Sequence, residues 1–365
     1  MALVRTSQGY RRYAFSIKYN GTAFLGFSYQ GALGENCITP NGTDLRGIYS
    51  VEGKVRAAFD ALLGGIENGS KDQYENFQVS SRTDKGVHAW KNTFHVDVKR
   101  DWEGAKFVKG LNFHLIRHAR DQIDKKHHRA RRGQGIYPTY DSSGLLLYST
   151  ENDIRLTKCL LAPLKQIENK HFMSYGNIQP QFIDWNARFT AISRTYTYRI
   201  ITDDDGVPFE ANNAWRINRY RTDTAILDLK SMRIASKYLL GYHDFSSFRG
   251  ANCSRSSPFV NIQAIDIHSR LLSSCYFGVV EDPLLPPHIN NKNMSQLVTI
   301  TIRGESFLYR QVRNMIGCLV AVGHGQMKPE DVREILLAKD RDQAPAMAPA
   351  RGLFLANVEH KDFAI

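Results

Sequence analysis

The spacing of apolar residues in this chain changes from strand-like to helix-like and back, and it does so in the same order twice. In the first half, alternation at every second position predicts a strand over residues 13–19 that ends in an Asn-Gly turn. Apolar residues at helical spacing predict a helix over residues 50–63, stopped by a Gly-Gly pair. Two further strands are expected at residues 77–80 and 93–98. The first half therefore reads strand, helix, strand, strand.

The second half follows the same order and then continues further. Its expected strands are residues 194–200, 260–268, 297–303 and 352–360, and its expected helices are residues 222–240, 306–323 and 329–338. We predict an α+β protein of two halves, residues 1–183 and 184–365, with mostly antiparallel sheets. The two halves share a pattern of elements but no residue-level repeat.

The charge balance favours a polyanionic partner. Lys and Arg number 48 against 36 Asp and Glu, which gives a net charge of +12 and a pI near 9.4. A protein that neutralises phosphates gains affinity by releasing counterions, so nucleic acid is the leading candidate. Solubility alone is the alternative explanation of this charge. No apolar run approaches the roughly 20 residues that span a bilayer, so we expect no membrane role.

Cysteine spacing and the N-terminal residues bear on the compartment. The five cysteines are widely spaced and form no pair typical of a zinc site, so we expect buried thiols in a reducing, intracellular compartment. Residues 1–12 are basic but lack the apolar core of a secretory signal. The choice between a mitochondrial and a cytoplasmic or nuclear protein stays open.

Two segments stand outside the pattern of strands and helices. Residues 117–148 hold the basic block KKHHRARRG (125–133), which we expect to be an exposed loop. Contact with phosphate and a merely solvated insert remain equal alternatives for this block. Residues 281–296 are rich in proline and asparagine and predict a surface connection between strands.

The first candidate for chemistry is the run SRTDKGVHA (81–89) between two expected strands. An ordinary turn, with Asp84 accepting backbone N–H bonds, would explain part of it. It would not explain why Arg82 and Lys85 flank the aspartate. An arginine within hydrogen-bonding distance keeps a carboxylate ionised and oriented, as a nucleophile requires. Gly86 would allow a large ligand to approach the backbone.

The second candidate is a polar stripe on the helix expected at residues 306–323. Arg310, Arg313, Asn314 and Gly317 are spaced so that they share one helix face. The solvated side of a helix is one explanation, and a face that binds phosphates or a partner carboxylate is the other.

The third candidate is the strand RTYTYRI (194–200). Alternation places Tyr196 and Tyr198 on one face, with Arg194 and Arg199 nearby. The tyrosines would either pack into a core or form a platform on which RNA bases stack, an interaction worth about 1 to 3 kcal/mol per base.

At this point the chain resembles the tRNA pseudouridine synthase A (TruA) family, and within it most closely the animal tRNA pseudouridine synthase-like proteins. The matching segments occur in the family's order over most of the chain: RTDKGVHA (82–89), NARFTA (186–191), RTYTYRI (194–200), HDFSSF (243–248), FLYRQVRNMIG (307–317) and APARGLFL (348–355). Departures are the 117–148 insert, a longer stretch before residue 186, Asn186 where histidine is common and Lys85 where alanine is frequent.

The resemblance implies the pseudouridine synthase fold: two ferredoxin-like halves whose mostly antiparallel sheets merge, with a central catalytic cleft. It also implies that Asp84 is the catalytic aspartate, with Arg82, Tyr196 and Arg313 as the other catalytic residues. No metal or other cofactor is implied. We expect contacts to the substrate from Thr83, Gly86, His88, Arg188, Arg194, Arg310 and Asn314.

The expected reaction is the conversion of uridine to pseudouridine in tRNA, with the anticodon arm as the implied region. Asp84 would attack C1′ of the ribose, deprotonate C2′ or add to C6 of the base, and the sequence leaves these three routes open. Other RNA substrates and a homodimer also stay open. A non-catalytic RNA chaperone would keep the basic surface but would have no need of Asp84. A metal-dependent hydrolase is a third class, but no metal-ligand spacing supports it.

Overall fold

The structure is a computed structural model that describes residues 9–28, 50–64, 73–130, 153–166, 182–203, 212–218, 227–272, 295–361 and 363–365. The chain folds into two compact units. Unit 1 comprises residues 1–192 together with 358–365, and unit 2 comprises residues 193–357.

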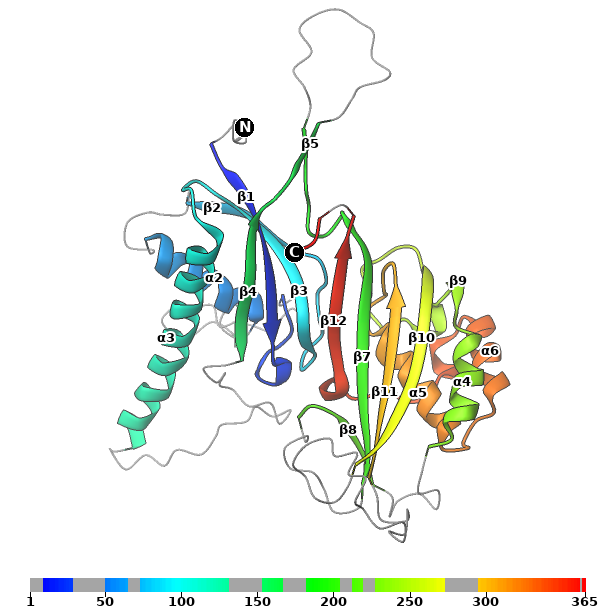
Figure 1. Cartoon of the computed structure of the whole chain (residues 1–365). Helices are drawn as coiled ribbons and strands as arrows, with labels where there is room; N and C mark the ends of the chain where they lie inside the picture. The colour runs from blue at the N-terminus through cyan, green and yellow to red at the C-terminus, as the bar shows by residue number, and fades with distance from the viewer. Residues whose placement is uncertain are drawn as a thin grey trace, which may run out of the picture. The chain divides into compact units, whose positions relative to one another are not determined.

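Unit 1 is built on an antiparallel sheet in the order β4-β1-β3-β2. Its elements along the chain are β1 (Arg11–Tyr19), the 3₁₀ turn η1 (Gly21–Ala23), α2 (Val51–Leu63), β2 (Tyr74–Val79), β3 (His88–Val98), α3 (Gly104–Ala130) and β4 (Ile154–Leu161). Two short strands, β5 (Leu164–Gln166) and β6 (Phe182–Asp184), form a separate antiparallel pair. Figure 1 shows α2 and α3 beside one another next to this sheet.

The helix expected at residues 50–63 is confirmed, and its ends show why the sequence was readable there. The Ser50 hydroxyl accepts a hydrogen bond from the Gly53 N–H at 3.0 Å, which caps the start of α2. Gly64 ends the helix in the left-handed region, with a φ of 108°. Both signals are local, so neighbouring residues alone define this helix.

Aromatic side chains form the core of unit 1. Phe15 of β1 stacks on Phe94 of β3 with ring centroids 4.9 Å apart. Phe59 of α2 and Phe107 of α3 contact each other at 5.5 Å, and both meet Phe15 edge to face. Four fully buried phenylalanines therefore join both helices to the sheet.

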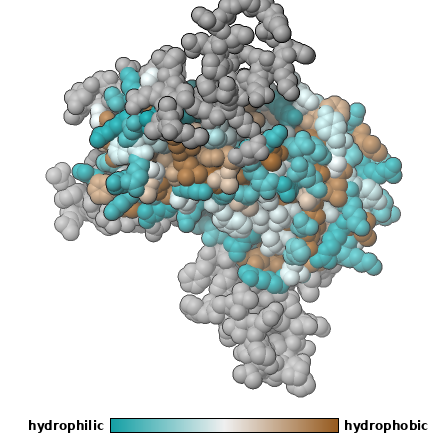
Figure 2. Space-filling model, turned by 45° about the horizontal axis from the view of Figure 1, so that its top comes forward, coloured by the Kyte–Doolittle hydropathy of each residue, from teal (hydrophilic) through white to brown (hydrophobic). Residues whose placement is uncertain are grey.

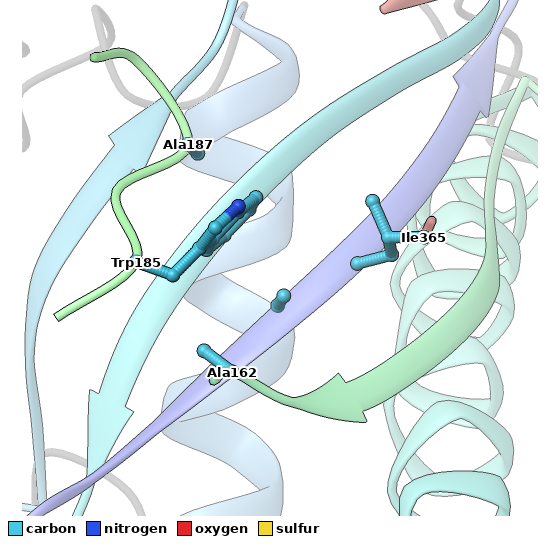
Figure 3. Packing of buried hydrophobic residues seen from close by; sticks show 5 residues of the cluster. Ala162, Trp185, Ala187 and Ile365 are labelled. Atoms are coloured by element: carbon cyan, nitrogen blue, oxygen red, sulfur yellow. The ribbon is translucent and has the colours of Figure 1, made fainter. Parts of the chain in front are cut away.

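Residues 358–365 return to unit 1 after the chain has formed unit 2. Ile365 belongs to a buried cluster with Ala14, Ala162, Trp185 and Ala187, which Figure 3 shows in close-up. Phe363 packs against this cluster with its ring edge to face with Trp185, 5.2 Å away.

Unit 2 contains a sheet in the order β12-β7-β11-β10-β9, in which β7, β11, β10 and β9 pair antiparallel. The short strand β8 adds to β7 in parallel. Its strands are β7 (Ala191–Asp203), β8 (Trp215–Asn218), β9 (Gly241–Asp244), β10 (Phe259–Leu272), β11 (Ser295–Gly304) and β12 (Leu353–His360). Its helices are α4 (Leu229–Lys237), α5 (Gln311–Gly323) and α6 (Pro329–Ala338), with 3₁₀ turns η7 (Ser246–Phe248), η9 (Arg341–Gln343) and η10 (Ala350–Gly352).

The α+β class and the mostly antiparallel pairing are confirmed, whereas two predicted boundaries are wrong. The helix expected to begin at Ser306 begins at Gln311, because Arg310 adopts a left-handed φ of 61° that an α-helix does not allow. The loop expected from residue 117 is helical as far as Ala130, because α3 continues through most of the basic block. Residues 131–148 of that segment lie outside the described residues.

Two other expectations fall partly outside the described residues. The helix expected at 222–240 is described as α4, Leu229–Lys237, while residues 222–226 are not described. Of the connection expected at 281–296, only the first residues of β11 are described. The predicted division of the chain into domains of residues 1–183 and 184–365 stays a prediction.

Hydrophilic and apolar residues intermingle over the surface that Figure 2 shows. None of the helices among the described residues is long and apolar enough to cross a membrane.

Candidate functional site

Asp84 lies in a tight turn between β2 and β3. The Asp84 carbonyl accepts a hydrogen bond from the Val87 N–H at 3.1 Å, which closes the turn over Lys85 and Gly86. Gly86 has a φ of 75°, a conformation that side chains with a Cβ rarely adopt, so glycine is needed at this corner. Asp84 is half-buried, while Arg82 and Lys85 are exposed on either side of it in the chain.

The segment just after β1 cradles this turn. The Phe27 N–H donates to the Thr83 carbonyl at 3.1 Å, and the Gly86 N–H donates to the Phe24 carbonyl at 3.2 Å. Two glycines make this approach possible: a Cβ on Gly21 would lie 2.0 Å from the Val87 oxygen, and one on Gly26 would lie 2.7 Å from the Thr83 oxygen. Backbone therefore packs directly on backbone beneath Asp84.

Thr83 and His88, both expected to contact substrate, are buried and hydrogen-bonded within unit 1. The Thr83 hydroxyl lies 2.8 Å from the Tyr19 hydroxyl. His88 Nδ1 accepts a hydrogen bond from the Gly21 N–H at 3.1 Å, so its proton in the neutral form lies on Nε2. These contacts hold one end of the turn against the end of β1 and the other against Gly21.

Arg188 lies in a second, separate turn of unit 1. The Asn186 side-chain oxygen accepts hydrogen bonds from the backbone N–H groups of Arg188 at 2.9 Å and Phe189 at 3.2 Å. The exposed Arg188 guanidinium lies 5.4 Å from the centre of the Phe189 ring, which is 74% exposed. Asn186 therefore has a structural role, and an arginine on an aromatic ring faces solvent beside it.

The two tyrosines of β7 differ in their surroundings. Tyr196 is mostly buried and meets the Phe307 ring edge to face at 5.2 Å. Tyr198 is fully buried, and its hydroxyl donates to the Pro349 carbonyl at 2.8 Å. Burial raises the pKa of Tyr198, which the positive charges of Arg313 and Arg351 partly oppose. Tyr198 is therefore a core residue. The predicted alternative in which both tyrosines form a platform for RNA bases is wrong.

Two residues of the predicted stripe, Asn314 and Gly317, face protein. The Asn314 side-chain amide is buried and donates to the Phe248 carbonyl at 2.8 Å, and its oxygen accepts from Arg341 at 3.1 Å. At Gly317 a Cβ would lie 2.2 Å from the Ala346 carbonyl oxygen. The solvated-side explanation is therefore wrong for these two residues.

Arg313 is fixed by the same neighbouring segment. Its Nε donates to the Ala348 carbonyl at 2.8 Å, and the Ala348 N–H donates back to the Arg313 carbonyl at 3.1 Å. Because the Nε edge of the guanidinium group is held in this way, the backbone of Ala348 defines the direction in which the Arg313 side chain points. Its positive charge also lowers the pKa of the Tyr198 hydroxyl, against the larger effect of burial.

The remaining arginines of the expected site lie at the edges of unit 2. Arg310 is exposed at the start of α5, with its guanidinium 4.8 Å from the centre of the Tyr309 ring. Arg194 donates from Nη1 to the Glu305 carbonyl at 2.7 Å, across the pair formed by β7 and β11.

The structure thus gathers the expected residues in two groups, one in each unit. Unit 1 carries Asp84, Arg82, Thr83, Gly86, His88 and Arg188, and unit 2 carries Tyr196, Arg313, Asn314, Arg194 and Arg310. The sequence reasoning missed Gly21 and Gly26 of the cradle, although the Asn20-Gly21 turn was visible. It also missed Tyr19, which bonds to Thr83, and Asn92, whose amide donates to the Ser81 carbonyl at 2.8 Å. Among the described residues, no group of three or more His, Cys, Asp or Glu side chains is placed to hold a metal ion.

Comparison with known proteins identifies the kind of enzyme. A family model described as tRNA pseudouridine synthase matches residues 235–361, which include α5 and β12. The tRNA pseudouridine synthase A of Sinorhizobium fredii is 26% identical over 349 residues, which cover 96% of this chain and 99% of the relative. The protein of the same name from Allorhizobium ampelinum is 28% identical, with 96% and 95% covered. The chain is a pseudouridine synthase, an isomerase, and it is similar over 96% of its length to the TruA-type enzymes of these bacteria.

The relatives match this synthase from end to end, so the likeness is not confined to one unit. A third, from Agrobacterium fabrum, is 27% identical over 351 residues, again 96% of this chain. These named relatives are bacterial, and they give no support to the resemblance to the animal proteins, which stays a prediction.

Proposed function

We propose that this synthase isomerises uridines of tRNA, in the anticodon arm, to pseudouridine, with Asp84 as the nucleophile. The observation that carries the assignment is the turn at Asp84. The turn closes through Gly86 and lies on a backbone cradle that only glycine at positions 21 and 26 permits. A half-buried carboxylate fixed from below, with Arg82 and Lys85 next to it in the chain, is suited to attack a sugar or base that enters from outside.

The isomerisation breaks the bond between N1 and C1′ of the nucleotide and forms one between C5 and C1′. The proton on C5 is removed, and N1 ends with a proton, so the atoms balance without a cofactor. Asp84 would act at C1′, at C2′ or at C6, and the three routes remain alternatives. In each of them the uracil must leave its stack to reach the carboxylate.

We assign the remaining roles from the positions that match the resembled family. Arg313 would hold Asp84 ionised and oriented, which fits a guanidinium whose direction is set by the Ala348 carbonyl. Tyr196 would contact the uracil and assist proton removal at C5. Arg82 would replace the flipped nucleotide in its stack. These roles require the two units to form the merged pseudouridine synthase fold, two ferredoxin-like halves with the catalytic cleft between them.

The residues expected to bind the substrate divide by exposure. Arg188, Arg194 and Arg310 would contact the RNA backbone, and Gly86 would allow the RNA to approach the turn closely. Thr83, His88 and Asn314 are buried, and we propose that they support the site by holding the turn and α5 in place.

Several finer expectations form part of this proposal. We keep the animal-like subgroup, the division into residues 1–183 and 184–365, and additional RNA substrates as predictions. We also keep the prediction of an intracellular protein, either mitochondrial or cytoplasmic or nuclear, and that of a possible homodimer.

Replacement of Asp84 by asparagine tests the proposal. The wild-type protein should release tritium from C5-labelled uridine in tRNA transcripts. Asp84→Asn should lower the rate at least about 1,000-fold, because a catalytic group that acts as nucleophile cannot be replaced by an amide. Binding of tRNA, measured by filter retention at fixed salt, should change only a few-fold.

Asp101→Asn serves as the matched control, because Asp101 is a half-exposed aspartate of unit 1 with an ion pair to Arg11. It should keep full activity. Turnover by Asp84→Asn would refute the nucleophile, and wild-type protein that binds tRNA in a salt-dependent manner without turnover would instead indicate a non-catalytic RNA binder.

A further inference from the structure

A buried hydrogen-bond network links β1 and β3 to the turn that carries Asp84. Tyr19 ends β1, and its hydroxyl lies 2.8 Å from the Thr83 hydroxyl, one residue before Asp84. Asn92 of β3 donates from its amide to the Ser81 carbonyl at 2.8 Å and to the Tyr19 hydroxyl at 3.4 Å. These contacts touch the chain at residues 81 and 83, directly on the approach to Asp84.

The Asn92 side chain uses all of its polar atoms in this network. The Tyr19 hydroxyl accepts from Asn92 and shares one hydrogen bond with the Thr83 hydroxyl, in which either group can be the donor. The Asn92 oxygen accepts from the Thr93 N–H at 2.9 Å, so the amide of this completely buried side chain makes a bond at each of its polar atoms. A buried polar network in which every group is satisfied defines a single arrangement of the chain.

The register between β1 and β3 changes beside Asn92. Ile17 pairs with Asn92 but Tyr19 pairs with Ala89, so two steps along β1 face three along β3. The extra residue is a β-bulge in β3, a feature that redirects side chains beside functional sites. Asn92 itself follows on the β2–β3 ladder, in which Val79 pairs with Phe94 and the Ser80 N–H donates to the Thr93 carbonyl at 2.9 Å, so its amide reaches Ser81.

We propose that Tyr19 and Asn92 are positioning residues for catalysis, which hold the 81–84 segment so that the Asp84 carboxylate is aimed at its target. The proposal rests on the proposed function, in which Asp84 is the nucleophile. Neither side chain touches the substrate, because both are buried beneath the turn. Their effect is therefore on the rate of the chemical step and not on the binding of RNA.

Tyr19→Phe is the decisive variant, because it removes one hydroxyl and keeps the ring that packs against Phe27 at 5.9 Å. We expect kcat for tritium release to fall about 10-fold to 100-fold, since a displacement of a reacting group by about 1 Å has effects of this size. KM for tRNA should stay within two-fold. Thr83→Val removes the other end of the same hydrogen bond, and the double variant should be no slower than the slower single variant.

Tyr13→Phe is the matched control. Tyr13 is a buried tyrosine of the same strand whose hydroxyl accepts from the Trp102 N–H at 2.9 Å and lies away from the turn. It loses a comparable hydrogen bond, so its thermal stability should fall about as much as that of Tyr19→Phe, with kcat unchanged. A purely structural role for Tyr19 would give the two variants the same kcat.

Amide hydrogen exchange supplies a readout that does not depend on turnover. Tyr19→Phe should speed exchange at residues 82–86 relative to wild type and to Tyr13→Phe, while exchange in β3 beyond Thr93 stays the same. Unchanged exchange at the turn, or unchanged kcat alongside an inactive Asp84→Asn, would overturn the positioning role and leave the nucleophile intact. Activity in Asp84→Asn would instead overturn the proposed function, and the exchange result would still decide whether Tyr19 holds the turn.

Discussion

Two neighbouring arginines of β1 make ion pairs that should differ greatly in their contribution to stability. Arg12 donates to both carboxylate oxygens of Asp97, from Nε at 2.6 Å and from Nη2 at 2.7 Å. The Asp97 side chain is only 2% exposed and that of Arg12 10% exposed. Arg11 pairs with Asp101 at 3.0 Å, but the Asp101 side chain is 47% exposed.

We therefore compare Asp97→Asn with Asp101→Asn. The first leaves a buried guanidinium without its counter-charge and also disturbs the Asn76 amide, which donates to Asp97 at 2.9 Å. Breaking one partner of such a buried pair costs about 3 to 5 kcal/mol of the free energy of unfolding. Removing a half-exposed charge costs less than about 1 kcal/mol, because water and salt screen it.

Urea unfolding followed by tryptophan fluorescence measures how far each variant lowers the free energy of unfolding of unit 1. Trp90, Trp102 and Trp185 lie in unit 1 and only Trp215 lies in unit 2, so the signal reports mainly on the unit that holds both pairs. Repeating the titration in 1 M salt should abolish the small effect of Asp101→Asn and preserve that of Asp97→Asn. Equal losses for the two variants, or a loss at Asp97 that disappears in salt, would refute the reasoning from burial.

Two further predictions follow from buried titratable groups. Burial lowers the pKa of His95 to about 3. As the pH falls below about 6.5, the unfolded chain therefore takes up a proton that the folded chain does not. The free energy of unfolding should decline by up to roughly 1.4 kcal/mol per pH unit until about pH 3. His95→Asn, which keeps an acceptor for the Ala187 N–H, should reduce this slope in urea titrations at pH 7 and pH 5, and an unchanged slope would contradict the assignment. Burial raises the pKa of Cys159 and Cys318 to about 12, whereas hydrogen bonds from the backbone at Tyr309 and Arg255 and from Arg249 outweigh burial and lower the pKa of Cys253. Iodoacetamide at pH 8 should therefore label Cys253 first of these three in peptide mass maps, and earlier labelling of Cys159 or Cys318 would show that their surroundings are open.

Elements with signals at both ends were predictable from the sequence. The helix α2 has Ser50 before it and Gly64 after it, so local residues define both of its ends, whereas α6 has a local signal, Pro329, only at its start. The start of α5 was placed too early because the apolar spacing continues through Leu308, and nothing in that spacing reveals that Arg310 is left-handed. The basic end of α3 was read as a loop because its charged residues obscure the helical spacing.

The candidate site was predictable only where its residues are neighbours in the chain. The charged residues around Asp84 are adjacent in the chain, so the motif could be recognised directly. Tyr19 lies 64 residues from Thr83, and Asn92 reaches the Ser81 carbonyl through the pairing of β2 with β3, whose register the sequence does not reveal. The buried role of Asn314 likewise depends on Phe248, 66 residues away. Contacts of this length are created by the fold and have no signature in a local pattern.

The return of residues 358–365 to unit 1 has a consequence for the order in which the protein is made. Within that segment His360 lies 2.8 Å from the Thr93 hydroxyl on β3, and Ile365 fills the cluster around Trp185. A ribosome that has already produced the whole of unit 2 has not yet released these groups. Unit 1 is therefore begun first and completed last. During translation its Trp185 cluster lacks Ile365 until residues 358–365 have left the exit tunnel.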